Sequence, residues 1–220
     1  MHPDTRSRLI AARSSLILAP VVAGVSVVTQ PDLGGTAADR LAAMSTPLAA
    51  LSAVAFLLSQ LPMLVAFLAI GRLLLPQAPR LSAWGTGLAV VGCFGHTVFG
   101  GTSLVYLMMA RDSHRSIQVD LYDRLQSSPV MIFSALGLLG TVLGVLLLGI
   151  GLFRTRTGPV WVGPAIWAFL LVEFVGSAVS VYASYLSVLL LGAAFIALAG
   201  VLGDRSMPRT LPEPDLAGRR

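Results

Sequence analysis

Long apolar stretches make up most of the chain, and the short segments between them and the two chain ends hold most of its charged residues. Crossing the hydrocarbon core of a bilayer takes about 20 mostly apolar residues in a helix. Six stretches reach this length, and none shows the two-residue alternation of a membrane β-strand, so each predicts a helix. The predicted helices are Leu9–Val28, Leu48–Leu74, Leu81–Ala110, Pro129–Phe153, Val160–Ser180 and Tyr182–Leu202.

Composition agrees with this pattern. Of the 220 residues, 55% are hydrophobic and only 11% are charged, whereas about a quarter of the residues in a soluble domain are charged. We therefore predict an all-α polytopic membrane protein in which residues 1–202 form one bundle of six transmembrane helices. Residues 203–220 combine several prolines with both signs of charge, which predicts a disordered cytoplasmic tail.

The first predicted helix follows Arg6 and Arg8, as the apolar core of a signal peptide would. Its apolar run is longer than that of a usual signal peptide, and no small-x-small cleavage site follows Val28 cleanly. An uncleaved first helix is therefore the favoured interpretation, with cleavage as the alternative.

Arginine positions define an expected orientation. In short loops, basic residues gather on the cytoplasmic side of the membrane. The side of the bundle that holds both termini carries most arginines and is therefore expected to be cytoplasmic. Its arginines are Arg6, Arg8, Arg13, Arg72, Arg80, Arg154, Arg156, Arg205, Arg209, Arg219 and Arg220. Those of the other side are Arg40, Arg111, Arg115 and Arg124. Interfacial aromatic residues are expected to follow the same division, with Trp84 and Trp161 inside. Those expected outside are Tyr106, Tyr182 and Tyr185.

Two outer segments are long enough to contain structure. Residues 29–46 carry glycines and aspartates and are expected to be irregular. In residues 111–128, Ile117, Leu121 and Leu125 recur every four residues, which predicts a short helix on the outer membrane surface. Four potential metal ligands of this segment lie among arginines, so we expect a solvated face with internal ion pairs. They are Asp112, His114, Asp120 and Asp123.

Gly140 and Gly144 have the GxxxG spacing that lets helices approach closely in a membrane. The predicted helix Leu81–Ala110 is also rich in glycine. These faces are expected to pack helices together, within one chain or in a homodimer. Membrane lipids are the other expected partners, because arginines at helix ends contact anionic headgroups. The sequence contains no clustered basic face, so no nucleic-acid partner is expected.

In these features the chain resembles six-helix integral membrane proteins of high-GC bacteria whose function is unknown. The resemblance covers most of the chain. It rests on arginine without lysine, on helices rich in alanine, leucine and glycine, and on short loops. It implies a multi-pass protein of the bacterial plasma (inner) membrane, and it implies no activity and no residue role.

Few polar side chains fall deep inside the predicted helices, where charges are costly and usually have a partner. Glu173 is the only deep acid and His96 the only deep histidine. At a rise of about 1.5 Å per residue, both lie about 20 Å from the cytoplasmic ends of their helices, which predicts a buried pair. Such a pair either locks two helices together or exchanges a proton. Gln60, Thr97 and Ser177 are further candidates for a ligand- or proton-binding site.

The leading interpretation is a small carrier or ligand-binding membrane protein, with a polar cavity near Glu173, His96 and Gln60 that opens outward. One alternative is a membrane-embedded enzyme acting on a lipid or isoprenoid, with Glu173 as general acid. A structural or regulatory membrane subunit is the other. The sequence favours a role other than catalysis. No cofactor or metal is expected, because Cys93 is the single cysteine, bis-histidine haem needs a second deep histidine, and zinc needs three protein ligands.

Overall fold

The computed structural model describes residues 3–112 and 114–204, and every regular element in these ranges is a helix. The elements are α1 (Pro3–Thr29), α2 (Ala37–Met44), α3 (Pro47–Leu74), α4 (Pro79–Ala110), α5 (Arg115–Gln126), α6 (Val130–Thr155), α7 (Val162–Leu171), the π-helical segment η1 (Val172–Gly176) and α8 (Val181–Asp204). The all-α prediction is confirmed. α8 includes Gly203 and Asp204, and the rest of the predicted tail, residues 205–220, lies outside the described residues.

Five helices in the described ranges are long and apolar enough to cross a membrane. They are Arg6–Thr29 within α1, the whole of α3, α4 and α6, and Val181–Gly203 within α8. Each corresponds to one of the stretches predicted from the sequence. The chain therefore has the helices of a multi-pass membrane protein.

The remaining predicted span, Val160–Ser180, is shorter than expected. α7 and η1 together form the apolar helix Val162–Gly176, which is well below the length of the other five. The chain then turns, and the amide of Ser180 donates to the carbonyl oxygen of Gly176 at 2.9 Å. The turn contains Val179, which is 86% exposed, and no charged residue. Because the turn is nearly as apolar as the helix, hydropathy alone does not show where the helix ends.

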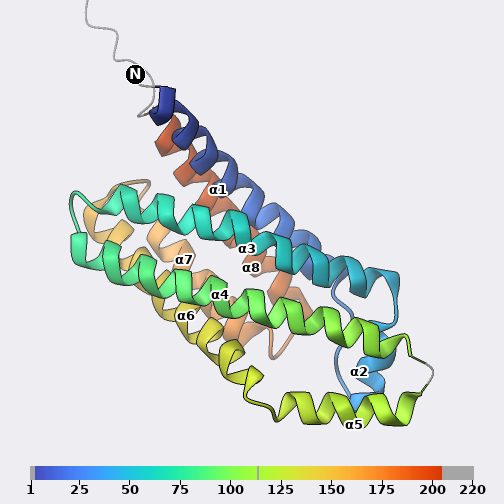
Figure 1. Cartoon of the computed structure of the whole chain (residues 1–220). Coiled ribbons are helices and arrows are strands. Elements are labelled where there is room, and N and C mark those ends of the chain that lie inside the picture. Colours follow the sequence, from blue (N-terminus) through green and yellow to red (C-terminus); the bar gives the residue numbers. More distant parts are fainter. Residues whose placement is uncertain (1–2, 113, 205–220) are drawn as a thin grey trace, which may run out of the picture.

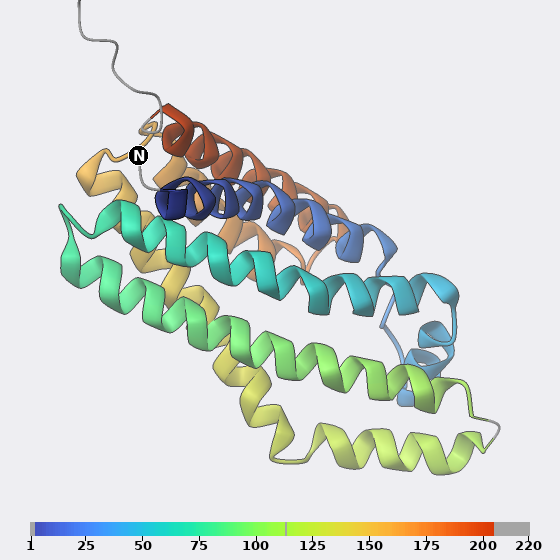
Figure 2. The ribbon, with the colours of Figure 1, turned by 45° about the horizontal axis from the view of Figure 1, so that its top comes forward.

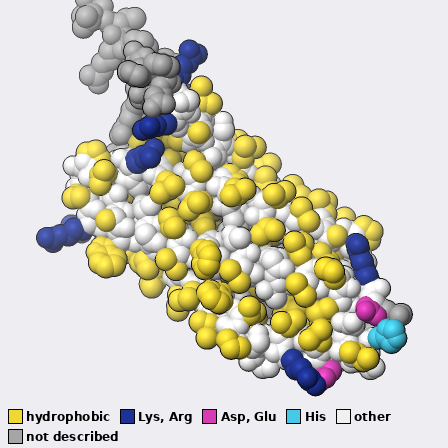
Figure 3. All heavy atoms as spheres, in the orientation of Figure 1, with side chains coloured by type: hydrophobic (Ala, Val, Ile, Leu, Met, Phe, Trp, Pro, Cys, Tyr) yellow, Lys and Arg dark blue, Asp and Glu magenta, His cyan; other side chains and the backbone are white. Residues whose placement is uncertain are grey.

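The long helices form a bundle (Figures 1 and 2). α1 packs against α3 and α8, α3 against α4, and α4 against α6, while α7 contacts both α6 and α8. The N-terminus, the α3–α4 turn and the α6–α7 turn lie at one end, and α2 and α5 lie at the other (Figure 1). On the face shown in Figure 3, charged side chains lie at these two ends and hydrophobic ones cover the surface between them. This distribution is typical of a protein that spans a bilayer.

Buried apolar side chains form two separate clusters. The larger cluster joins the long helices with α7 and includes Leu16 and Phe195. The smaller cluster lies beneath α2 and α5 and includes Leu41, Tyr106 and Tyr122. Tyr106, expected near the outer end of its helix as an interfacial aromatic residue, does lie near the end of α4, but it is buried with 2% exposure and so does not face lipid. The reason is that α2 and α5 cover the end of α4.

Residues 29–46 were expected to be irregular, but they contain α2 and are therefore irregular only in part. This helix begins with a capping box between Thr36 and Asp39. The Asp39 carboxylate accepts hydrogen bonds from the Thr36 hydroxyl at 2.7 Å and the Thr36 amide at 2.9 Å. These bonds, the side-chain one foremost, hold the pKa of Asp39 below its usual value. The box satisfies backbone groups at the helix start, which explains how so short a helix forms.

α5 confirms the short helix predicted in residues 111–128. The predicted internal ion pairs are also present. Arg124 donates to Asp120 at 2.7 Å, and His114 Nδ1 lies 3.2 Å from an Asp112 carboxylate oxygen. The location of α5 on the outer membrane surface stays a prediction.

Glycines bring α4 and α6 into close contact. Several positions in this interface have room only for glycine, because a Cβ atom there would overlap the backbone of the other helix. They are Gly92 and Gly95 in α4 and Gly137, Gly140 and Gly144 in α6. These glycines therefore pack two helices of one chain. A homodimer stays a prediction, and it would have to use another face.

Candidate functional site

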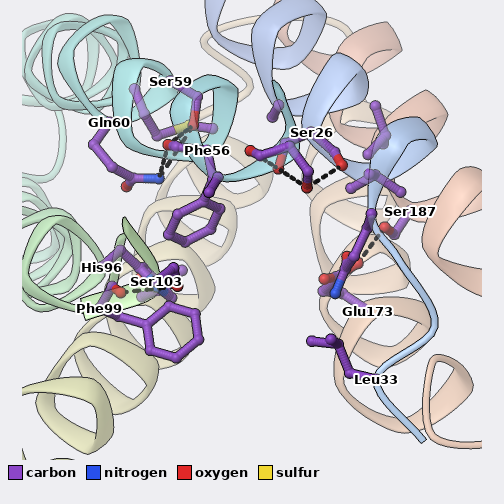
Figure 4. A pocket seen from close by; sticks show the side chains of 18 of the residues that line it. Ser26, Leu33, Phe56, Ser59, Gln60, His96, Phe99, Ser103, Glu173 and Ser187 are labelled. Atoms are coloured by element: carbon purple, nitrogen blue, oxygen red, sulfur yellow. Dashed lines mark hydrogen bonds between the residues drawn. The ribbon is translucent and has the colours of Figure 1, made fainter. Parts of the chain in front are cut away.

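A cavity of about 480 Å³ lies between the two apolar clusters. Side chains from α1, α3, α4, α6, α7, η1 and α8 line it, and residues of α2 and α5 line the end that these two short helices cover. Its volume falls within the range of about 300–1,000 Å³ that is typical of small-molecule sites. Figure 4 shows part of the lining, in which serine, amide, imidazole and carboxylate groups alternate with aromatic rings.

Gln60, His96 and Glu173, three of the residues predicted from the sequence, line this cavity. Gln60 on α3 is buried, and its amide nitrogen donates to the carbonyl oxygen of Phe56 at 3.2 Å and to the Ser59 hydroxyl at 3.1 Å. His96 on α4 meets Phe56 edge to face, with ring centroids 5.7 Å apart. α3 and α4 therefore form one wall of the cavity.

Glu173 lies on η1, and its carboxylate is bonded to α8. The Ser187 hydroxyl donates to Oε2 of Glu173 (Figure 4). Ser187 is fully buried, and its hydroxyl also lies 2.8 Å from the carbonyl oxygen of Ser184. Glu173 on η1 is thus bonded to Ser187 on the next helix, α8.

The predicted direct pair of Glu173 and His96 is wrong. Neither a hydrogen bond nor an ion pair joins them, although both belong to the part of the chain that the structure describes. They face the cavity from opposite sides (Figure 4). The reason is that η1 packs against α7 and α8, whereas α4 packs against α3 and α6. Counting residues along a helix gives depth but not the side of the bundle.

Thr97 and Ser177, the other two candidates, are not among the lining residues. The Thr97 hydroxyl donates to the carbonyl oxygen of Cys93 at 2.8 Å. The Ser177 hydroxyl donates to the backbone carbonyl of Glu173. Bonds of this kind, to a carbonyl one turn back, are the ordinary solution for a hydroxyl in an apolar helix.

Sequence analysis missed several polar residues of the cavity. Ser26 on α1 and Ser52 on α3 bond across the two helices, each hydroxyl donating to the other residue's carbonyl oxygen at 3.0 and 2.8 Å. Ser187 was missed too, and Arg40 was considered only as an outer-loop charge. The available signal was a polar residue isolated in an apolar run. That signal is ambiguous because most such serines bond within their own helix, as Ser177 does.

The cavity combines a few separate polar groups with apolar walls. Its described lining has one carboxyl group, on Glu173, one imidazole, on His96, and one guanidinium, on Arg40. Nowhere in residues 3–112 and 114–204 do three or more His, Cys, Asp or Glu side chains gather as metal ligands. Separate hydrogen-bonding groups among aromatic and aliphatic side chains can hold a small molecule that has both polar and apolar parts.

No protein-family model, no curated protein and no solved structure matches the chain.

Proposed function

We propose that the protein is a small carrier or ligand-binding protein of the bacterial plasma membrane, with its binding site in the cavity between Gln60, His96 and Glu173. The observation that carries this proposal is the cavity itself, which lies inside a bundle of membrane-length helices. A purely structural subunit would be expected to have a closed bundle. An enzyme acting on a lipid would be expected to place Glu173 at the end of an apolar tunnel, whereas this carboxylate shares the cavity with many polar groups.

The proposal includes six crossings, with both termini in the cytoplasm. The start of α1 and the end of α8 lie at the same end of the bundle (Figure 1), which supports an even number of crossings. The Arg13 guanidinium of α1 lies beside Gly203 of α8, in agreement with this arrangement. The short helix Val162–Gly176 would make the fifth crossing together with the turn that follows it.

Cysteine labelling tests this topology. Ser127 and Gln77 are both exposed and lie at opposite ends of the bundle. With the buried Cys93 replaced by serine, Ser127→Cys should react with an impermeant maleimide added to intact cells. Gln77→Cys should react only after the membrane is permeabilised, because Arg72 and Arg80 flank that loop. Labelling of Gln77→Cys in intact cells would contradict the orientation.

Filling the cavity tests the binding function. Ser103 lines the cavity, and its hydroxyl bonds only within α4, to the carbonyl oxygen of Phe99 at 3.1 Å. Thr102 makes the same kind of bond, to Val98 at 3.1 Å, but does not line the cavity. Ser103→Trp should remove any small molecule that native mass spectrometry finds on wild-type protein released from native-lipid nanodiscs. Thr102→Trp is the matched control and should retain it.

Two results would count against the binding function. One is an adduct of equal occupancy in Ser103→Trp and wild type. The other is wild-type protein that carries no adduct straight from its native lipid. Thermal unfolding of both tryptophan variants separates loss of ligand from loss of fold.

A further inference from the structure

The outer end of the cavity holds a second group of polar side chains, apart from Gln60, His96 and Glu173. Its members come from three elements that meet there, since α2 contacts both α4 and α5. We refer to them as the outer subsite. They are Arg40 of α2, Tyr106 of α4, and Tyr122 and Gln126 of α5.

Arg40 lies in the outer subsite without a counter-ion. Its guanidinium makes no ion pair with any residue that the structure describes, and its Nε is buried without a hydrogen-bond partner there. Of the acids on α2 and α5, Asp39 accepts from Thr36, Asp120 accepts from Arg124, and Asp123 is exposed. Arg40 as a whole is half-buried, but its Nε is a donor that is shielded from water and unpaired, which is costly. The outer subsite is therefore suited to an anion.

Two phenol groups supply further donors. Tyr106 is 2% exposed, and its hydroxyl oxygen is buried with no partner in the described part of the chain. The ring of Tyr122 lies with its centroid 4.7 Å from that of Tyr106. Its hydroxyl accepts from Gln126 Nε2 at 3.0 Å, which leaves its own proton free to donate. A guanidinium with two hydroxyl donors matches the oxygens of a carboxylate or phosphate group.

The deeper part of the cavity suits an apolar body. Several of its polar groups already bond to one another, as Ser26 does with Ser52, Gln60 with Ser59 and Ser187 with Glu173. Much of the remaining wall is aromatic or aliphatic. It includes Phe56, Met63, Phe67, Phe99, Phe169 and Leu191.

We propose that the cavity binds an anionic amphiphile, a carboxylate or phosphate monoester on an apolar chain, with its charged group at Arg40 and Tyr106 and its chain directed towards Phe56. The outer subsite lies at the end of the bundle where lipid headgroups are expected, so the ligand would be oriented like a lipid of that leaflet. This assignment rests on the proposed function and names the ligand class of the same cavity.

Direct binding tests the assignment. The full-length chain is placed in nanodiscs of phosphatidylcholine, and radiolabelled laurate is the probe, with empty nanodiscs as background. Unlabelled laurate and dodecyl phosphate should both displace it. Dodecanol, which lacks the charge, should be weaker by about tenfold or more, and inorganic phosphate, which lacks the chain, should not compete. Displacement of laurate by inorganic phosphate would mean that the outer subsite binds a free anion, and it would overturn the proposal that the ligand is an amphiphile.

Variants identify the group that recognises the anion. Arg40→Gln should weaken laurate binding by about tenfold and leave dodecanol unchanged, whereas Arg40→Lys should retain part of the affinity. Tyr106→Phe removes one hydroxyl and should weaken laurate by a smaller factor. Arg124→Gln is the matched control, because it removes an exposed cation from the same end of the bundle. Thermal unfolding of each variant confirms that it is folded.

The outcomes separate this inference from the function on which it rests. If laurate and dodecanol bind equally, Arg40→Gln changes neither, and Ser103→Trp blocks both, the cavity is a binding site but the anionic ligand class is wrong. If Ser103→Trp binds laurate as wild type does, laurate binds outside the cavity. That result overturns the inference. Loss of laurate binding in Arg40→Gln and its partial retention in Arg40→Lys, with dodecanol binding retained and the fold intact in both, supports the assignment.

Discussion

Leucine in place of Gly95 should prevent the bundle from assembling. A Cβ at Gly95 would overlap the backbone of Gly137 and the carbonyl oxygen of Phe133 on α6, and neither can move without shifting that helix. α4 and α6 form the most extensive helix pair in the structure. Overpacking of a well-packed core typically costs about 1–3 kcal/mol and occasionally more. Because the obstacle here is backbone, the cost should lie at or above the upper end of that range.

The measurement is the yield of monodisperse protein and its thermal unfolding in detergent. Gly87→Leu is the matched control, because it lies on the same helix and has no neighbouring atom within 4 Å of the added Cβ. This variant should purify like the wild type. Gly137→Leu should behave like Gly95→Leu, since the two glycines face each other. A stable Gly95→Leu protein would mean that the helices do not meet at these glycines.

The long helices could be predicted from the sequence because burial in lipid demands long apolar runs, and those runs are directly visible. The short elements are set by different causes. α2 depends on the bond pattern between Thr36 and Asp39, which is a local signal and was available. The end of η1 depends on the turn before Ser180, and no charged residue marks it. Hydropathy therefore predicts where a helix exists better than where it stops.

The cavity was predictable only in part, for a related reason. Gln60, His96 and Glu173 were recognisable as polar residues inside apolar helices, with His96 and Glu173 at similar depth. Which of them touch depends on how each helix is rotated about its axis. In helices that are apolar on every side, the sequence carries little information about that rotation. The partnership of Glu173 with Ser187 follows from it and could be found only in the structure.

Removing either side chain of the Glu173–Ser187 hydrogen bond should destabilise the protein. In Ser187→Ala the Glu173 carboxylate loses the serine hydroxyl that donates to it. Leaving a hydrogen-bonding group inside the protein without its partner costs about 1–3 kcal/mol, so the free energy of unfolding in detergent should fall by up to about this amount. Glu173→Ala should also destabilise the protein, whereas Glu173→Gln should be milder because an amide still accepts the bond. Ser177→Ala is the control, since that exposed hydroxyl bonds only to a backbone carbonyl of its own turn.

Double-mutant cycles then decide between Ser187 and His96 as the residue that Glu173 contacts. The double variant Glu173→Ala, Ser187→Ala should lose about 0.5–3 kcal/mol less stability than the sum of the losses in the two single variants. The Glu173→Ala, His96→Ala pair should be additive within about 0.5 kcal/mol, because no contact joins these residues across the cavity. The reverse result, additivity with Ser187 and coupling with His96, would place Glu173 on the other side of the cavity. It would also remove the separation between the two walls on which a ligand site of this size depends.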